Sequence, residues 1–430
     1  MARLRDQLLS TYAAEGINLI SGVVFGIMSA RALEPEGRGV VAAAWAAVSI
    51  STLISSLGIG KSLISRLNDS DSGLTAADYL GGVLALMPVV MMLGWAVLFS
   101  MAPNFPPEQR ILGWVLIALA IPVVFVSDMV RSVLRARRRI FWLNLTVSGG
   151  AVLRVAVMGL LWMLGVISIG AVLVIEIGFH AVIAAVGCWS LRGALLNGPR
   201  MGAVTGAVKA MLGYGILFQL YSLLFNMINR VNVVMLEKIT GAEAAGYFAI
   251  GARLAEYMGT LTMQISFVMI PYLAQQRDKS DAVQRAMDLV RMSVLVLVPA
   301  GVVLMLVAGY LIPILYGSAF VSSVAICRTM IPGIVAAVLF QLASMPAVAA
   351  GRMRLVTMCS AIGFAVNGVA MLILTPRWGA VGAAAAATLG YVSLLGAHLL
   401  TLRLSMGISP IDVLIPKRSD FMAVRRALKV

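Results

Sequence analysis

The sequence contains little charge. Only 12% of its 430 residues are charged, whereas 61% are hydrophobic and the mean hydropathy is +0.97. A soluble domain usually carries about a quarter charged residues and under half apolar ones, so this composition excludes a soluble enzyme. Cysteine is also rare. Cys188, Cys327 and Cys359 lie in apolar runs without metal-ligand spacing, so they indicate small core residues and neither a disulfide framework nor a metal site.

Motifs for catalysis are missing as well. The sequence has no CxxC, no HExxH, no Gly-rich phosphate loop and no Ser/His/Asp arrangement. The longest predicted outer connection is about 102–110, which is too short for the acceptor- and donor-holding loops of a membrane glycan polymerase. We expect a protein that is not an enzyme, without a cofactor or metal.

Long apolar runs dominate the chain. A membrane-crossing helix needs about 20 apolar residues, and hydropathy together with helix breakers predicts twelve of them. We read the first as a retained helix instead of a signal peptide, because Glu15 and Asn18 interrupt it. The predicted spans are 8–30, 39–60, 79–101, 111–130, 141–164, 170–190, 209–236, 246–271, 290–312, 323–345, 355–375 and 380–402. The predicted fold is all-α and polytopic.

The net charge of +15 is explained by topology. Of the 33 Lys and Arg residues, 24 lie in the two terminal segments, in alternate connections or within two residues of these, and only 5 lie in the opposite connections. This bias predicts that both termini are cytoplasmic. In a soluble protein the same charge would suggest nucleic acid, but here no nucleic-acid partner is expected.

The two halves of the chain resemble each other. Three matches recur at offsets of 207 to 215 residues, six predicted spans apart: Glu36 and Gly39 with Glu243 and Gly246, Ile121-Pro122 with Ile331-Pro332, and Arg137–Ile140 with Arg352–Leu355. Such repeats predict two pseudo-symmetric six-helix lobes around a central cavity, as in alternating-access transporters. We expect lobes at 1–200 and 201–402, followed by a basic cytoplasmic tail at 403–430.

Four arginines lie more than two residues inside predicted spans: Arg154, Arg230, Arg253 and Arg328. Charges at that depth usually face a protein interior or a wet cavity. Arg154 is nearest a midplane, whereas Arg328 is shallow enough for its guanidinium to reach the outer headgroups. Guanidinium stays protonated and binds phosphate bidentately, so the deep arginines suit an anionic diphosphate head.

Spans 7 and 8 carry the most informative polar set. Arg230 and Arg253 are predicted at about the same depth on adjacent antiparallel spans, and Arg253 and Glu256 share a helix face. Two interpretations stay open, an internal salt bridge or a cationic wall of a central cavity. Asn229 and Asn232 could hydrogen-bond sugar hydroxyls or link helices. The candidate substrate-binding residues are Arg154, Arg230, Arg253, Glu256, Asn229 and Asn232.

Three further residues are candidates for ion coupling. Glu176 and His180 are spaced i,i+4, so both lie on one helix face, where a carboxylate beside an imidazole could relay protons. A structural, hydrogen-bonded histidine is an equal alternative. Glu15 in span 1 poses the same choice between coupling and structure.

Several segments resemble one known family. The run Ala30-Arg31-Ala32-Leu33-Glu34-Pro35-Glu36-Gly37-Arg38-Gly39 is similar to the first-loop signature of bacterial oligosaccharide/polysaccharide flippases, which belong to the multidrug/oligosaccharidyl-lipid/polysaccharide exporter superfamily. Similar segments follow at 229–232, 241–248, 315–320 and 379–384. This sequence departs from the family pattern at Glu34, where glycine is usual, and at Asn232, where aspartate is common.

The resemblance implies a flippase for a polyprenyl-diphosphate-linked oligosaccharide in the bacterial cytoplasmic (inner) membrane, serving the biosynthesis of a surface lipopolysaccharide or exopolysaccharide. The glycan head would pass between the lobes while the lipid tail stays among the membrane lipids. A polysaccharide polymerase is an open candidate partner. Two alternatives remain: a cation-coupled multidrug antiporter of the same superfamily and, from another class, a membrane enzyme of glycan assembly.

Overall fold

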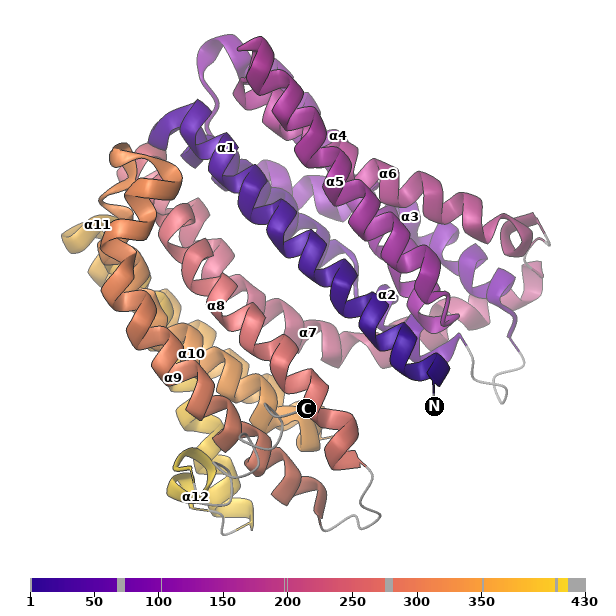
Figure 1. The fold of residues 1–430 in the computed structure, drawn as a ribbon. Helices are drawn as coiled ribbons and strands as arrows, with labels where there is room; N and C mark the ends of the chain where they lie inside the picture. The colour runs from indigo at the N-terminus through magenta and orange to yellow at the C-terminus, as the bar shows by residue number, and fades with distance from the viewer. Residues whose placement is uncertain are drawn as a thin grey trace. The chain divides into compact units, whose positions relative to one another are not determined.

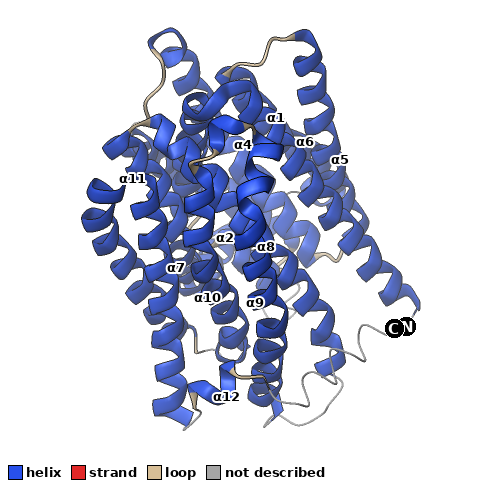
Figure 2. Ribbon diagram, turned by 60° about the vertical axis from the view of Figure 1, so that its left-hand side comes forward, coloured by secondary structure: helices blue, strands red, loops and turns tan. Residues whose placement is uncertain are grey.

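The computed structural model describes residues 2–67, 74–101, 103–196, 198, 200–274, 281–349, 352–406 and 409–416, and every regular element in these ranges is helical (Figures 1 and 2). The long helices are α1 (Ala2–Ser55), α3 (Ala76–Met101), α4 (Arg110–Ala136), α5 (Ile140–Leu164), α6 (Ile169–Leu196), α7 (Met201–Thr240), α8 (Ala242–Ala274), α9 (Asp281–Tyr316), α10 (Ser323–Ala349) and α11 (Met353–Met406). The short ones are α2 (Ile59–Arg66), η2 (Pro107–Gln109), η3 (Ser318–Phe320) and α12 (Pro410–Leu414).

The predicted spans correspond to these helices. Eleven of the twelve lie wholly inside a helix. The span predicted at 39–60 is too long, because α1 stops at Ser55, before Leu57 and Gly58 with φ angles of 48° and 76°. Two apolar segments, Ala13–Ser55 and Met353–Ser405, are 43 and 53 residues long, and each holds two spans. The protein is therefore an all-helical polytopic membrane protein, as predicted.

The two double-length helices are interrupted by single residues. In α11 the interruption is Gly379, and in α1 it is Glu34, with φ 57° and ψ −179°. That backbone region is almost restricted to glycine, and a side chain held there costs about 1–3 kcal/mol. Glu34 stands where the resembling family usually has glycine, so the departure noted in the sequence coincides with a strained residue.

Replacing Glu34 with glycine is expected to stabilise the protein by about 1 kcal/mol, because strain is relieved while only part of the gain is offset by the freer unfolded chain. Glu36→Gly is the matched control, since Glu36 is also exposed but helical, and it is expected to destabilise by a similar amount. Thermal unfolding of the purified proteins in detergent measures both. Destabilisation by Glu34→Gly would contradict the strain argument.

The chain divides into two compact units, residues 1–223 and 224–430. The division lies inside α7, later than the boundary at residue 200 that the sequence repeat suggests. The first part of α7 belongs to the first unit, where the Ser62 hydroxyl donates to the Met211 carbonyl (2.6 Å) and the Gln219 amide donates to the Ser56 hydroxyl (3.1 Å).

Corresponding features recur in the two units. The 3-10 helices η2 and η3 begin 211 residues apart, and each precedes a long helix with an internal proline. Residues with positive φ recur at similar offsets, Glu34 with Gly241 and Gly165 with Gly379. These pairs lie at equivalent turns between predicted spans, which extends the repeat from sequence to backbone conformation.

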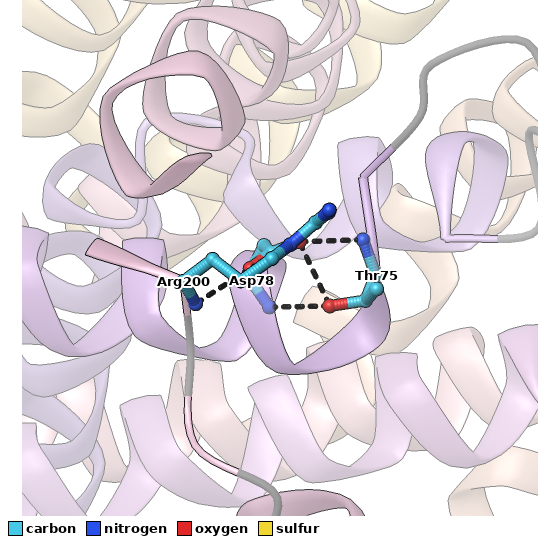
Figure 3. A network of polar contacts seen from close by, with 3 residues as sticks. All are labelled: Thr75, Asp78 and Arg200. Atoms are coloured by element: carbon cyan, nitrogen blue, oxygen red, sulfur yellow. Dashed lines mark hydrogen bonds and ion pairs between the residues drawn. The ribbon is translucent and has the colours of Figure 1, made fainter. Parts of the chain in front are cut away.

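In the first unit, α4 packs on α6 and α1 lies beside α5 (Figure 1). A polar network ties the start of α3 to the residue before α7 (Figure 3). The fully buried Asp78 carboxylate accepts from the Thr75 amide (2.7 Å), the Arg200 amide (2.9 Å) and Arg200 Nη2 (2.6 Å). The Thr75 hydroxyl accepts in return from the Asp78 amide (3.3 Å), completing a capping box. The ion pair raises the pKa of the exposed Arg200.

In the second unit, α10 packs against α8, α9 and α11, and it is the most buried of the apolar segments. Glycines allow this close packing. A Cβ on Gly333 would lie 2.7 Å from the Thr388 Cα, and one on Gly382 would lie 2.2 Å from the Leu374 carbonyl oxygen. His398 is buried, with its Nε2 3.1 Å from the Ala343 carbonyl oxygen.

The segment after α11 is held by a buried arginine. Arg291 on α9 donates to the Asp412 carbonyl of α12 (2.8 Å) and pairs with Asp288 on its own helix. Of the tail predicted at 403–430, residues 407–408 and 417–430 lie outside the described residues. Within that tail, α12 packs on α9.

Candidate functional site

Arg154 is the central charged residue of the first unit. It lies on α5, and its Nη1 is 3.2 Å from the Glu176 carboxylate on α6, with side-chain exposures of 11% and 17%. The rings of Phe25 and Phe179 lie 4.9 and 4.8 Å from the guanidinium carbon, so cation–π contacts also hold the arginine. The Arg154 Nε is buried without a hydrogen-bond partner among the described residues.

His180 has partners of its own. Its Nδ1 lies 2.8 Å from the Ser127 hydroxyl on α4, and its ring lies against Trp45 and Phe179. Because Ser127 also lies 2.9 Å from the Val124 carbonyl and has a single proton, His180 Nδ1 donates whenever Ser127 donates to Val124. Glu176 and His180 therefore occupy one face of α6 but contact different helices, α5 and α4.

Glu15 lies half-buried in α1, within electrostatic range of Arg135 on α4. Arg135 also interacts with Arg131 and Asp128 on its own helix and with Lys61 on α2. Burial and the Arg135 charge lower the pKa of Lys61. The ion-coupling candidates of the sequence thus belong to two neighbourhoods of the first unit, one around Arg154 and one around Arg135.

In the second unit, Glu256 joins two predicted candidates. Glu256 on α8 accepts from the Asn229 amide on α7 and lies 3.5 Å from Arg253 Nη1. The i,i+3 pair of Arg253 and Glu256 and the neighbouring positions of spans 7 and 8 are therefore as predicted. Arg253 also lies over the Tyr257 ring, at 5.8 Å, and 55% of its side chain remains exposed. Asn229 Oδ1 is buried and has no partner among the described residues.

Arg230 lies on α7, one residue after Asn229. Its charge interacts with Glu256, Arg253 and Tyr391, and no hydrogen bond joins it to a residue in the described part of the chain. Tyr391 is buried beside Phe225, with ring centroids 5.7 Å apart. Two arginines therefore share one carboxylate, and this part of the second unit carries an excess of positive charge.

Asn232 has a different environment. Its side chain is fully buried and exchanges hydrogen bonds with Asn367 on α11, at 3.0 and 3.2 Å, and it also donates to the Ala383 carbonyl (3.2 Å). Asn367 donates in turn to the Ile228 carbonyl (3.4 Å). Asn232 thus joins α7 to both halves of α11, the helix-linking alternative of the sequence, and reaching a ligand would require breaking this amide pair.

Some residues of these sites were not singled out in the sequence. Asn367 had a usable signal, because an amide in the middle of an apolar span needs a partner. Asp78 also had one, the Thr75-x-x-Asp78 capping-box spacing before an apolar run. Nothing in the sequence distinguishes Phe25 and Phe179, since aromatic residues in membrane spans are common. Among the described residues, no group of three or more His, Cys, Asp or Glu could hold a metal ion.

The sequence profile of the family described as "Polysaccharide biosynthesis protein" matches residues 28–325, more than half of the chain. The chain belongs to the polysaccharide biosynthesis protein family. No curated protein matches the sequence of this family member.

Solved structures share the fold of this polysaccharide biosynthesis protein. The lipid II flippase MurJ, in an inward closed conformation, is similar with a TM-score of 0.73 and 14% identity over 96% of this chain and 89% of that chain. An inward-facing multidrug resistance transporter of the MATE family is similar with a TM-score of 0.68 and 14% identity, over 91% of this chain and 94% of that chain. The MATE multidrug transporter DinF-BH is similar with a TM-score of 0.61 and 17% identity, over 95% of this chain and 96% of that chain. These likenesses show that the chain has the fold of these flippase and multidrug transporter structures.

Proposed function

We propose that this polysaccharide biosynthesis protein is an alternating-access flippase. It moves a polyprenyl-diphosphate-linked oligosaccharide from the inner to the outer leaflet of the bacterial cytoplasmic membrane, with both termini in the cytoplasm. The glycan head crosses the membrane through the protein, and the lipid tail stays in the bilayer. The family match, the MOP fold and the distribution of basic residues support this proposal.

The observation that carries the proposal is the exposed Arg253 beside Glu256. Glu256 is fixed by Asn229 of the neighbouring helix, and Tyr257 supports the guanidinium from its own helix. An arginine held by a carboxylate and a ring keeps its orientation, and the planar guanidinium geometry suits the oxygens of a diphosphate. Arg230 adds a second positive charge nearby.

The other candidate residues differ in their burial and in their contacts. Arg154 is more enclosed than Arg253, and its buried Nε has no hydrogen-bond partner among the described residues. Glu15 and His180 are the titratable groups that do not form the Arg154 ion pair, so they remain candidates for ion coupling, whereas Glu176 holds Arg154. Asn232 we assign to the framework that positions Asn229 and Arg230 on α7.

A cation-coupled drug antiporter is the second candidate, because two of the similar structures are MATE multidrug transporters. A drug antiporter would expel cationic dyes from cells, and its efflux would depend on an acidic residue such as Glu15. The flippase predicts no dye efflux, together with lost surface polysaccharide and accumulated lipid-linked oligosaccharide in cells lacking the protein. Strong dye efflux abolished by Glu15→Gln would overturn the flippase proposal.

Replacing Arg253 with alanine is expected to lower export of surface polysaccharide about tenfold, the loss of one charge-assisted hydrogen bond to the substrate. Arg253→Lys is expected to restore part of the export, because it keeps the charge but not the two-pronged geometry. Surface glycan is measured in cells that produce each variant in equal amounts.

Arg328→Ala is the matched control for Arg253. Arg328 is also exposed and lies inside an apolar helix, but its Nε donates to the Met305 carbonyl of α9 (2.8 Å). Its removal is expected to leave export unchanged. Equal export by Arg253→Ala and the unaltered protein would remove Arg253 from the site.

A further inference from the structure

A wholly apolar groove lies on α11 of the second unit. Its volume is about 450 Å³. The seven lining residues are Ala365, Val366, Val369, Ala370, Ile373, Leu374 and Leu389. The groove lies between the two halves of α11, which turn at Gly379. None of these seven lining residues is polar, so a charged or sugar-like ligand would find no partner among them.

The groove is a fixed feature of the helix pair. A Cβ on Gly382 would lie 2.2 Å from the Leu374 carbonyl oxygen, and one on Gly390 would lie 3.0 Å from the Gly363 carbonyl oxygen. The two halves of α11 therefore contact each other backbone to backbone on either side of Leu389. The small Ala365 and Ala370 leave the space between their larger neighbours unfilled, so the groove exists before any ligand enters.

The groove remains uncovered by the second unit. Val369, Ile373 and Leu389 are 60%, 50% and 47% exposed. Ile362 and Leu372 on the same half of α11 are also exposed, and the whole segment belongs to an apolar span. An apolar surface of this kind in a membrane span is covered by hydrocarbon chains.

One end of the groove carries a positive charge. Ile373 and Arg377 are spaced i,i+4 on a continuous helix, so Arg377 stands one turn beyond the groove on the same stripe as Val366, Val369 and Ile373. Arg377 is exposed, and the adjacent Trp378 is 60% exposed. Tryptophan and arginine at the end of a span are typical of the headgroup level, where arginine pairs with phosphate.

The length of the groove indicates which kind of lipid chain fits it. From Ala365 to Leu374 the helix rises by about 14 Å at 1.5 Å per residue, and one leaflet contributes about 15 Å of the hydrocarbon core. A chain that fills the groove therefore runs through one leaflet with its phosphate beside Arg377. This geometry fits the acyl chain of a membrane phospholipid, whereas a long polyprenyl chain would leave most of its length outside.

We propose that the groove of α11 binds one acyl chain of an anionic phospholipid whose phosphate pairs with Arg377. The lipid is a resident partner of the second unit, and this inference does not depend on the transported substrate. It fills the space between the two halves of α11 and adds a polar contact at their turn.

Native mass spectrometry of the full chain tests this proposal, with phosphatidylglycerol and phosphatidylcholine added separately as probes. The unaltered protein is expected to retain phosphatidylglycerol in preference. Arg377→Gln is expected to lower that retention about tenfold, which corresponds to the loss of one charge-assisted hydrogen bond to phosphate. Val369→Trp, which fills the groove, is expected to lower retention of both lipids.

Two control variants keep the result specific. Arg354→Gln removes an exposed arginine from the other end of the same half of α11, and Leu372→Trp enlarges an exposed residue outside the groove. Both are expected to retain phosphatidylglycerol like the unaltered protein. Equal retention of the two lipids by the unaltered protein, or equal loss in Val369→Trp and Leu372→Trp, would overturn the proposal. So would displacement of the phospholipid by an equimolar polyprenyl phosphate, which would make the groove a carrier-tail site.

Discussion

Arg154→Ala is expected to abolish export and to lower the free energy of unfolding by about 3 kcal/mol. The substitution leaves the largely buried Glu176 carboxylate without its partner, and breaking a buried ion pair on one side is strongly destabilising. It also removes the cation between Phe25 and Phe179. Surface glycan reports export, and thermal unfolding in detergent reports stability.

The double variant Arg154→Ala/Glu176→Gln separates structure from transport. Removing both charges is expected to recover most of the stability, because no buried carboxylate is left unpaired. If Arg154 contacts the diphosphate, export stays lost in the double variant and returns in part with Arg154→Lys. Recovery of export in the double variant would restrict Arg154 to a structural role.

Arg192→Ala is the matched control for Arg154. Arg192 also stacks on an aromatic ring, with its guanidinium carbon 5.0 Å from the Trp189 ring centroid, but it is exposed near the end of α6. Exposed charges contribute little to stability. Export and unfolding temperature are both expected to stay unchanged, so a loss comparable to that of Arg154→Ala would point to a general effect of positive charge.

Asp78→Ala is expected to lower the free energy of unfolding by about 3 kcal/mol, because two main-chain amides lose the buried carboxylate that accepts their hydrogen bonds. Those amides belong to Thr75 and Arg200, on segments that are far apart in the sequence. Asp78→Asn keeps an acceptor oxygen and is expected to lose less. Thermal unfolding of the purified variants measures the series.

Arg200→Ala distinguishes the amide network from the ion pair. The Arg200 side chain is 59% exposed, and its removal leaves the main-chain bonds of Asp78 in place, so its effect is expected to be the smallest of the three. Asp128→Ala removes the 49% exposed partner of Arg131 within α4 and is expected to matter as little. An Arg200→Ala loss equal to that of Asp78→Ala would assign the stability to the ion pair.

The spans could be predicted from the sequence because hydropathy is a local property that a membrane helix must satisfy alone. Hydropathy does not locate a helix end that no change in apolar character marks, so such an end was predicted wrongly. Span 2 was placed past Ser55, and the short helices α2, η2, η3 and α12 were missed because they are brief and need not be apolar. The i,i+3 pair of Arg253 and Glu256 was predictable because both residues lie on one helix.

Contacts between side chains on different helices were harder to predict from the sequence. The contact of Arg154 with Glu176 needs the relative rotation of α5 and α6, which periodicity does not supply. Glu176 and His180 share a face of α6, yet one contacts α5 and the other α4, because a helix face is wide enough to meet two neighbours. The amide pair of Asn232 and Asn367 depends on a contact across 135 residues of sequence.

The division of α7 between the two units has a consequence for biosynthesis. Because the first unit includes residues up to 223, the six preceding spans cannot complete their packing when the sixth has entered the membrane. Chains emerge from the ribosome in sequence order, and domains generally fold as they emerge. The first unit must therefore wait for the seventh span, and a chain truncated after α6 would leave the cell with an unfinished bundle.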